Sequence, residues 1–169
     1  MRLTVRAILV ASFLVGCVGC DQTSKAIVRQ AVPPGVTHVY LGGVLRIQHA
    51  ENPGAFLSIG ASLPRTVRQL AFTLGVSVVV GALLLGAMFG RNLPMFRRLC
   101  LAAIAAGGAG NLIDRILHDG TVTDFLYLGM GPVHTGIFNL ADLTLTLGLA
   151  ALLLERPLSI WSGGRAPGV

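Results

Sequence analysis

Charged residues are scarce in this sequence, and acidic residues are the scarcer kind. Asp, Glu, Lys and Arg make up 12% of the chain, whereas soluble domains average about 25%. Seven residues are acidic and 13 are basic, aromatic residues contribute 6%, and 53% of the chain is hydrophobic. The mean hydropathy is +0.75. This composition excludes an ordinary soluble domain and indicates an integral membrane protein.

The net charge of +6 does not come from a basic stripe of the kind that binds nucleic acid, because the basic residues are scattered and flank apolar segments. We therefore expect membrane lipid, and no nucleic acid, as the anionic neighbour. Cysteine is also rare. Cys17 and Cys20 lie in an apolar segment that lacks the polar surroundings of a redox or zinc site. The sequence therefore predicts no metal and no cofactor.

Apolar runs predict four membrane spans in one integral membrane domain, residues 1–169. Gln69 to Gly90 is the clearest run, because it has no charge and lies between Arg68 and Arg91, and about 20 residues cross a bilayer. The remaining glycine-rich tail, about 160–169, is expected to be disordered. The predicted spans are about 6–24, 67–90, 96–115 and 137–155.

An even number of spans places both termini on one side of the membrane. Basic residues favour the cytoplasmic side, and a tight loop with three arginines joins the second and third spans. We therefore expect cytoplasmic termini and carboxylates at the extracytoplasmic face. The expected cytoplasmic arginines are Arg2, Arg6, Arg91, Arg97, Arg98, Arg156 and Arg165.

A small β region is predicted outside the membrane, at about 33–62. β-branched and aromatic residues lie on both sides of Gly42-Gly43, a pair that suits a hairpin turn. Two strands alone are marginally stable, so this sheet must rest on the helices or on lipid. The fold class is thus mainly α and membrane-embedded, with a small extracytoplasmic sheet.

Polar side chains gather between Gly107 and Asp142. Asn111, Asp114 and Arg115 are spaced by three and four residues, so they share one face of a helix. Asn139 and Asp142 have the same relation on the next apolar segment. Asp124 lies between them, in an apolar and aromatic run expected to lie against the membrane surface. Ionisable groups at a bilayer rim are costly and are therefore functional candidates.

Asp124 and Asp142 suit acid–base chemistry because no basic residue adjoins either in the sequence. Two facing carboxylates cannot both ionise cheaply, so one keeps a proton while the other stays charged. The charged carboxylate can take a proton from water and the protonated one can donate to a scissile carbonyl oxygen. The spacing alone does not prove such a pair.

Structural roles compete with functional ones at the other polar positions. Asp114 and Arg115 are expected to fix helix ends. Asp21 and Lys25 have the i,i+4 spacing of an ion pair, which either supports the fold or positions a substrate. The two asparagines either bind backbone or orient the aspartates, and Asp119 is expected in a turn.

Five short blocks together resemble the lipoprotein signal peptidase family, also called signal peptidase II. Their order and their placement on the predicted spans match that family, and the resemblance covers about residues 6–155. The blocks are D-Q-T-S-K at 21–25, N-P-G-A-F at 52–56, G-x-G-N-x-x-D-R at 108–115, T-D-F at 123–125 and F-N-L-A-D at 138–142.

The resemblance implies a membrane aspartyl endopeptidase of the bacterial inner membrane, with Asp124 and Asp142 as the catalytic pair. It would cut diacylglyceryl-modified prolipoproteins before the lipidated cysteine and would be a target of globomycin-type cyclic peptides. The implied fold has four transmembrane helices, a β-cradle and a small loop helix over the site. The residues implied to bind substrate or shape the site are Asp21, Lys25, Asn52, Gly54, Asn111, Asp114, Arg115 and Asn139.

Two positions depart from the family pattern. Thr123 precedes the first aspartate where the family usually has an aliphatic β-branched residue. Threonine is similar in shape to valine but carries a hydroxyl group. The segment PGAFLSIG after Asn52 has one alanine fewer than usual before its aromatic residue, so the alignment of Phe56 is open.

Other interpretations give different tests. A metallohydrolase would use His118, Asp119, Asp124 and His134 as ligands, and a carrier or channel would use the intramembrane charges as a pathway. The LVGC at 14–17 resembles the lipobox of a lipoprotein precursor. We predict no cleavage there, because a soluble domain does not follow.

Overall fold

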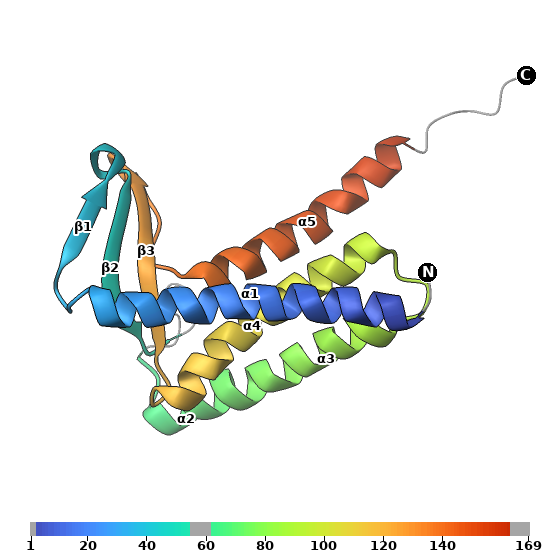
Figure 1. Cartoon of the computed structure of the whole chain (residues 1–169), viewed down its shortest axis with the longest axis horizontal. Helices are drawn as coiled ribbons and strands as arrows, with labels where there is room; N and C mark the ends of the chain where they lie inside the picture. The colour runs from blue at the N-terminus through green and yellow to red at the C-terminus, as the bar shows by residue number, and fades with distance from the viewer. Residues whose placement is uncertain (1–2, 55–61, 163–169) are drawn as a thin grey trace, which may run out of the picture.

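The computed structural model describes residues 3–54 and 62–162. Its helices run side by side and its sheet covers one end of them, while the first turn of α1 and the end of α5 lie toward the opposite end (Figure 1). The helical segments are α1 (Leu3–Ala31), α2 (Arg65–Gln69), the π-helical η3 (Leu70–Gly75), α3 (Val76–Phe89), α4 (Met95–Leu117) and α5 (Leu140–Ser162).

Membrane-spanning character is evident from the helices themselves. Among the described residues, Thr4–Ala31, Leu70–Phe89 and Met95–Leu117 are long and apolar enough to cross a bilayer. Large apolar side chains such as Leu74 and Val78 are exposed, as expected where lipid replaces water. The predicted mainly helical membrane fold with a small sheet is therefore confirmed.

Two helix boundaries differ from the prediction. α1 continues to Ala31, beyond the expected end at about residue 24, because its polar residues find partners in the bundle instead of ending the helix. α5 begins at Leu140, three residues later than expected, and runs to Ser162, so residues 160–162 are helical and not a disordered tail. The rest of that tail, 163–169, lies outside the described residues.

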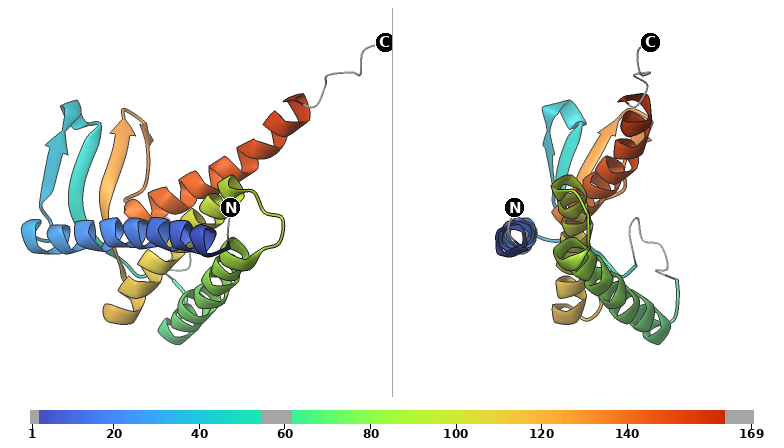
Figure 2. Two further views of the ribbon diagram at one scale, coloured as in Figure 1. Left: turned by 45° about the vertical axis from the view of Figure 1, so that its right-hand side comes forward. Right: turned by 90° about the vertical axis from the view of Figure 1, so that its right-hand side faces the viewer.

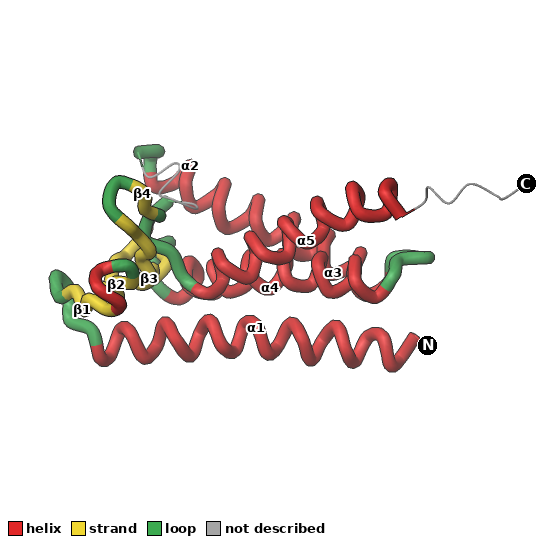
Figure 3. Tube along the Cα trace, turned by 90° about the horizontal axis from the view of Figure 1, so that it is seen from above, coloured by secondary structure: helices red, strands yellow, loops and turns green. Residues whose placement is uncertain are grey.

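Small residues bring α4 and α5 together, as the alanine and glycine spacing in α4 predicts. A Cβ atom on Gly107 would meet the carbonyl oxygen of Ala141 and lie 2.7 Å from Cβ of Leu145. From the side of α5, a Cβ atom on Gly148 would lie 2.8 Å from Cβ of Ala103 on α4. The two helices therefore pack backbone against backbone, and in Figure 3 they are seen from above, where α5 overlaps α4.

We expect Gly107→Ala to lower the stability of the bundle by about 1–3 kcal/mol, because the added methyl group has no space and α5 must move. Gly81→Ala is the matched control, since a Cβ there meets nothing within 4 Å. Thermal unfolding in detergent measures both variants. An equal melting temperature for the two would contradict the close packing of α4 on α5.

The sheet is antiparallel, with the order β1-β2-β3-β4. The hairpin predicted at Gly42-Gly43 is confirmed, with a turn, η1 (Leu41–Gly43), whose residues all have positive φ. The run around Asp124 was not predicted as a strand, yet it forms β3, paired with β2 on one side and β4 on the other. The strands are β1 (Thr37–Tyr40), β2 (Leu45–Asn52), β3 (Val122–Met130) and β4 (Val133–His134).

The last turns of α1 support the sheet. Val28 and Val32 pack against Phe125 of β3, with Ile47 and Leu126 around them. Figure 2 shows the same end of α1 beneath the strands in a second view. The sheet thus rests on a helix, which is one of the two supports that its small size demands.

Arg98 is not a free surface charge, although the sequence placed it with the cytoplasmic arginines. Its side chain is buried, and its guanidinium donates hydrogen bonds to backbone carbonyl oxygens at the end of α3 and in the following loop. These contacts join the end of α3 to the beginning of α4. The accepting residues are Ala87, Met88, Gly90 and Leu93.

Candidate active site

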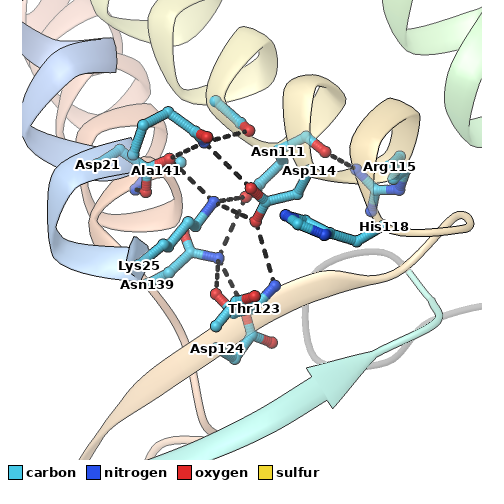
Figure 4. Close-up of polar contacts among 12 residues, drawn as sticks. Asp21, Lys25, Asn111, Asp114, Arg115, His118, Thr123, Asp124, Asn139 and Ala141 are labelled. Atoms are coloured by element: carbon cyan, nitrogen blue, oxygen red, sulfur yellow. Dashed lines mark hydrogen bonds and ion pairs between the residues drawn. The ribbon is translucent and has the colours of Figure 1, made fainter. Parts of the chain in front are cut away.

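The candidate site lies where the sheet meets the ends of α1, α4 and α5 (Figure 4). Polar and charged side chains from these four elements fill a buried space. Because buried charges are costly unless they are paired and hydrogen-bonded, each member of the cluster needs partners. The buried members are Asp21, Lys25, Asp114, Arg115, Thr123, Asp124, Asn139 and Asp142.

Asp124 projects from β3 and is held at both carboxylate oxygens. Asn52 Nδ2 donates to Oδ2 at 2.8 Å, and Asn139 Nδ2 donates to Oδ1 at 2.6 Å. Burial raises the pKa of Asp124 to about 6, and the charge of Asp142 acts in the same direction, while the two amide hydrogen bonds and Lys25 oppose the rise. Asp124 therefore exchanges its proton near neutral pH.

Asp142 lies in the first turn of α5, where the helix dipole favours an anion. Asn139 caps this helix: its side-chain Oδ1 accepts from the backbone N–H of Asp142 at 2.9 Å, and its backbone N–H donates to Asp142 Oδ2 at 3.4 Å. This reciprocal pair is a capping box. Asn111 Nδ2 donates to Asp142 Oδ1 at 2.8 Å, so both oxygens of this carboxylate are also held.

Asn139 is the residue that joins the two carboxylates, because its side-chain Nδ2 donates to Asp124 and its backbone N–H donates to the Asp142 carboxylate. Its Nδ2 also donates to Asn111 Oδ1 at 3.1 Å. Lys25 Nζ donates to the same Asn111 oxygen at 3.0 Å. This contact fixes which end of the Asn111 amide faces Asp142.

The ion pair predicted between Asp21 and Lys25 is confirmed at 2.9 Å, and Lys25 makes a second ion pair of 2.9 Å with Asp114. Each aspartate in turn holds backbone. Asp21 Oδ1 accepts from the amide of Ala141 at 2.8 Å, and Asp114 Oδ2 accepts from the amide of Thr123 at 3.1 Å. Lys25 therefore links α1 to the residues immediately before Asp142 and Asp124.

Arg115 was expected to fix a helix end, and its Nη1 donates to the carbonyl oxygen of Asn111 in the last turns of α4 at 3.2 Å. It also reaches the turn after β2, which was not predicted. Its Nη2 donates to the carbonyl oxygen of Gly54 at 2.8 Å, and its guanidinium carbon lies 5.6 Å from the ring centre of Phe72. The amide of Gly54 donates to Asn52 Oδ1 at 2.9 Å. Arg115 and Gly54 thus hold the loop that presents Asn52 to Asp124. Phe56 lies outside the described residues.

An apolar cavity of about 460 Å³ opens beside Asp142. Asn111, Arg115 and Asp142 form its polar edge, and its remaining lining is almost entirely apolar. A cavity of this kind suits an apolar peptide segment with its backbone near the carboxylates. The other lining residues are Phe72, Val76, Gly108, Leu145, Thr146 and Leu149.

Sequence reasoning missed two participants on α1. Gln22 Nε2 donates to Asp114 Oδ1 at 3.1 Å, and Arg29 Nη1 lies 3.8 Å from the same oxygen. Their signal was available, because polar residues recur along one segment at 21, 22, 25 and 29.

The histidine and aspartate set proposed for zinc does not assemble: the described part of the chain contains no group of three or more His, Cys, Asp or Glu residues that could hold a metal ion.

A sequence profile of signal peptidase (SPase) II matches residues 13–157. The chain belongs to the signal peptidase II family. The peptidase is similar to the lipoprotein signal peptidase of Moorella thermoacetica, with 35% identity over 150 residues, 87% of this chain and 91% of the relative. It is similar to that of Desulforapulum autotrophicum, with 33% identity over 154 residues, 90% and 91% of the two chains.

The fold of the peptidase is also similar to that of a solved structure described as a bacterial membrane enzyme determined by the in meso method. The TM-score is 0.78 at 26% identity, with 95% of this chain and 94% of that chain covered. The family resemblance of the five sequence blocks is therefore confirmed. Membership of a peptidase family gives no support to the carrier or channel interpretation.

Proposed function

We propose that the peptidase removes the signal peptide of diacylglyceryl-modified prolipoproteins by cutting immediately before the lipidated cysteine. The observation that carries this proposal is the pair of buried carboxylates, Asp124 and Asp142, joined through Asn139 at the edge of an apolar cavity. The family match supports the same reaction. The substrate is a membrane-anchored peptide, which suits a site between helix ends and a sheet.

Asp124 and Asp142 are the proposed catalytic pair. The ionised carboxylate takes a proton from the attacking water, and the protonated one donates its proton to the oxygen of the scissile carbonyl. The pKa of Asp124 near 6 supports the shared proton, because burial and the neighbouring charge disfavour two ionised groups. Asn111 and Asn139 keep the two carboxylates in place.

The apolar cavity is the proposed place of the last residues of the signal peptide. Arg115 and Asn111 at its edge are proposed to hold the substrate near the dyad, with Asn52, Asp21, Lys25, Asp114 and Gly54 shaping the site behind it. Globomycin-type cyclic peptides, which are apolar and carry backbone carbonyl groups, are proposed to compete for the same cavity.

The proposed topology has four spans, with α5 as the fourth, and cytoplasmic termini. Support comes from α1 and α5, whose free ends point away from the sheet (Figure 1), and from Arg91 in the loop between α3 and α4 and Arg97 in the first turn of α4. The sheet and the dyad then lie at the extracytoplasmic face of the inner membrane, within one domain.

Cleavage of a purified precursor tests the proposed function. The peptidase in detergent micelles is expected to shorten a diacylglyceryl-modified prolipoprotein and to leave the same precursor intact when its cysteine carries no lipid. Equal cleavage of both forms would contradict the proposed substrate class. No cleavage of either would contradict the reaction.

We expect Asn52→Ala to lower kcat about tenfold, the size of one lost hydrogen bond to a charged group. The limb of the pH profile that reports Asp124 should also move from about pH 6 to higher pH. The sign follows because the Asn52 hydrogen bond favours the charged form and holds the pKa down. Thr37→Ala, on the exposed strand β1, is the control. A limb that stays in place would contradict this role of Asn52.

A further inference from the structure

A second polar cluster lies on the sheet next to Asp124 and is centred on Glu51 of β2. Three side-chain groups lie within hydrogen-bonding distance of its carboxylate. The Thr121 hydroxyl lies 2.9 Å from Oε2 and 2.8 Å from the carbonyl oxygen of His118, and Thr123 Oγ1 donates to Oε1 at 3.1 Å. His49 Nε2 lies 2.9 Å from Oε1 and donates to it in the tautomer that carries a proton there. One carboxylate thus gathers donors from β2, β3 and the turn before β3.

We propose that Glu51 is a positioning residue for Asp124: its contacts with Thr121 and Thr123 hold the strand register in which Asn52 reaches the Asp124 carboxylate. The proposal rests on the proposed catalytic role of Asp124. The proposal gives a role to the hydroxyl group of Thr123, a residue found where the family pattern has an aliphatic side chain.

The strand register supports this role. Glu51 lies directly opposite Thr123, with Ala50 opposite Asp124 and Asn52 opposite Val122. Immediately before this set the register shifts, because between Ile47 and Ala50 the strand β2 carries one residue more than β3 does. Such a bulge redirects side chains and interrupts the ladder. The Glu51 contacts fasten the two strands just beyond the interruption, at the residues that carry the site.

Thr123 connects this contact to the helices. Its side chain is fully buried, and its hydroxyl accepts from Arg29 Nη1 at 2.9 Å while it donates to Glu51. A hydroxyl has one proton to donate and two lone pairs, so an anionic acceptor on one side sets its lone pairs toward the arginine. The last turn of α1, β3 and β2 are therefore joined in one chain of contacts.

The charge state of Glu51 agrees with its role as an acceptor. Burial acts to raise the pKa of this carboxyl, but the hydrogen bonds from His49, Thr121 and Thr123 outweigh burial and lower the pKa below its ordinary value. Glu51 is therefore ionised throughout the neutral range. A neutral amide in its place would accept through one oxygen only, so one of the two threonine hydroxyls would have to accept from the amide nitrogen instead.

Glu51→Gln and Glu51→Ala test the proposal. Glu155→Gln is the matched control, because Glu155 of α5 pairs with Arg97 of α4 and has no contact with the sheet in the ion pairs described. For cleavage of a lipidated precursor we expect kcat to fall about threefold in Glu51→Gln and about tenfold in Glu51→Ala, with KM within about twofold. The limb that reports Asp124 should move to higher pH, since a loosened Asn52 no longer holds that pKa down.

The pH shift is diagnostic because the charged neighbours of Asp124 on the helices are unchanged in these variants: Lys25 on α1, Arg115 on α4 and Asp142 on α5. A lower melting temperature without any movement of the limb would mean that Glu51 only stabilises the sheet, and it would overturn the proposal. A kcat equal to that of wild type, with the limb at the wild-type pH, would overturn the proposal as well.

Hydrogen–deuterium exchange separates this proposal from the proposed function. We expect faster exchange of peptides covering residues 45–52 and 121–126 in Glu51→Ala, and wild-type exchange in Glu155→Gln. If the wild-type chain cleaves nothing, the proposed function fails while exchange still decides whether Glu51 holds the register. Unchanged exchange in Glu51→Ala would contradict the positioning role regardless of activity.

Discussion

Asp124→Asn and Asp142→Asn are each expected to lower the cleavage rate by at least about 10³-fold, because removal of one member of a cooperating catalytic unit costs nearly as much as removal of all. Asparagine has the same shape as aspartate but can neither accept a proton from water nor supply an acidic one. The fold should survive, since asparagine fills the same volume and its one oxygen still accepts one of the hydrogen bonds that each carboxylate receives.

The two variants are compared with wild type in a cleavage assay, with circular dichroism to confirm the fold. Asp119→Asn is the matched control, because Asp119 lies in the turn after α4 with a φ of 52°, a conformation that asparagine also tolerates. Its rate should equal that of wild type. A rate within tenfold of wild type for either dyad variant would remove that aspartate from the catalytic pair.

Lys25→Met is expected to destabilise the protein by about 3–5 kcal/mol, because it removes the cation that lies between two buried carboxylates, and Arg29, 3.8 Å from Asp114, is too distant to replace it. The Lys25 side chain is completely buried, and it neutralises two carboxylates that are also buried, Asp21 and Asp114. Methionine fills a similar volume, so the loss would report the charge and not a cavity. Thermal and denaturant unfolding in detergent measure it.

A partly exposed ion pair provides the control for this prediction. Arg97 pairs with Glu155 at 2.7 Å, and 43% of the Arg97 side chain is exposed, so Arg97→Met should cost less than about 1 kcal/mol. Lys25→Met combined with Asp114→Asn should recover part of the lost stability, since one of the two carboxylate charges that Lys25 balanced is then removed. A cost for Lys25→Met as small as that for Arg97→Met would contradict the role of Lys25 as the centre of the buried network.

Much of the helical fold could be predicted from hydropathy, but the end of α1 could not. Gln22, Lys25 and Arg29 interrupt the apolar run, and a single sequence cannot show that their partners lie some 90 residues away on α4 and β3. The strand β3 was missed for a related reason. Its first four residues, Val122 to Phe125, are all buried, so the alternation that identifies a strand with one exposed face is absent.

The members of the candidate site could be predicted, but their partners mostly could not. The spacing of Asp21 and Lys25 predicted their local ion pair, and the spacing of Asn139 and Asp142 placed them together at one helix end. The contacts of Asn139 with Asp124, and of Asn52 with Asp124, depend on how β2 and α5 approach β3. Such contacts arise from tertiary packing, which local spacing does not encode.

The most direct test of the central claim is the mass of the signal peptide that the purified peptidase releases from a diacylglyceryl-modified prolipoprotein. We expect one peptide that ends at the residue before the lipidated cysteine, formed equally with and without a metal chelator and absent with Asp124→Asn. A peptide with a different end, or one that Asp124→Asn still releases at the wild-type rate, would contradict it.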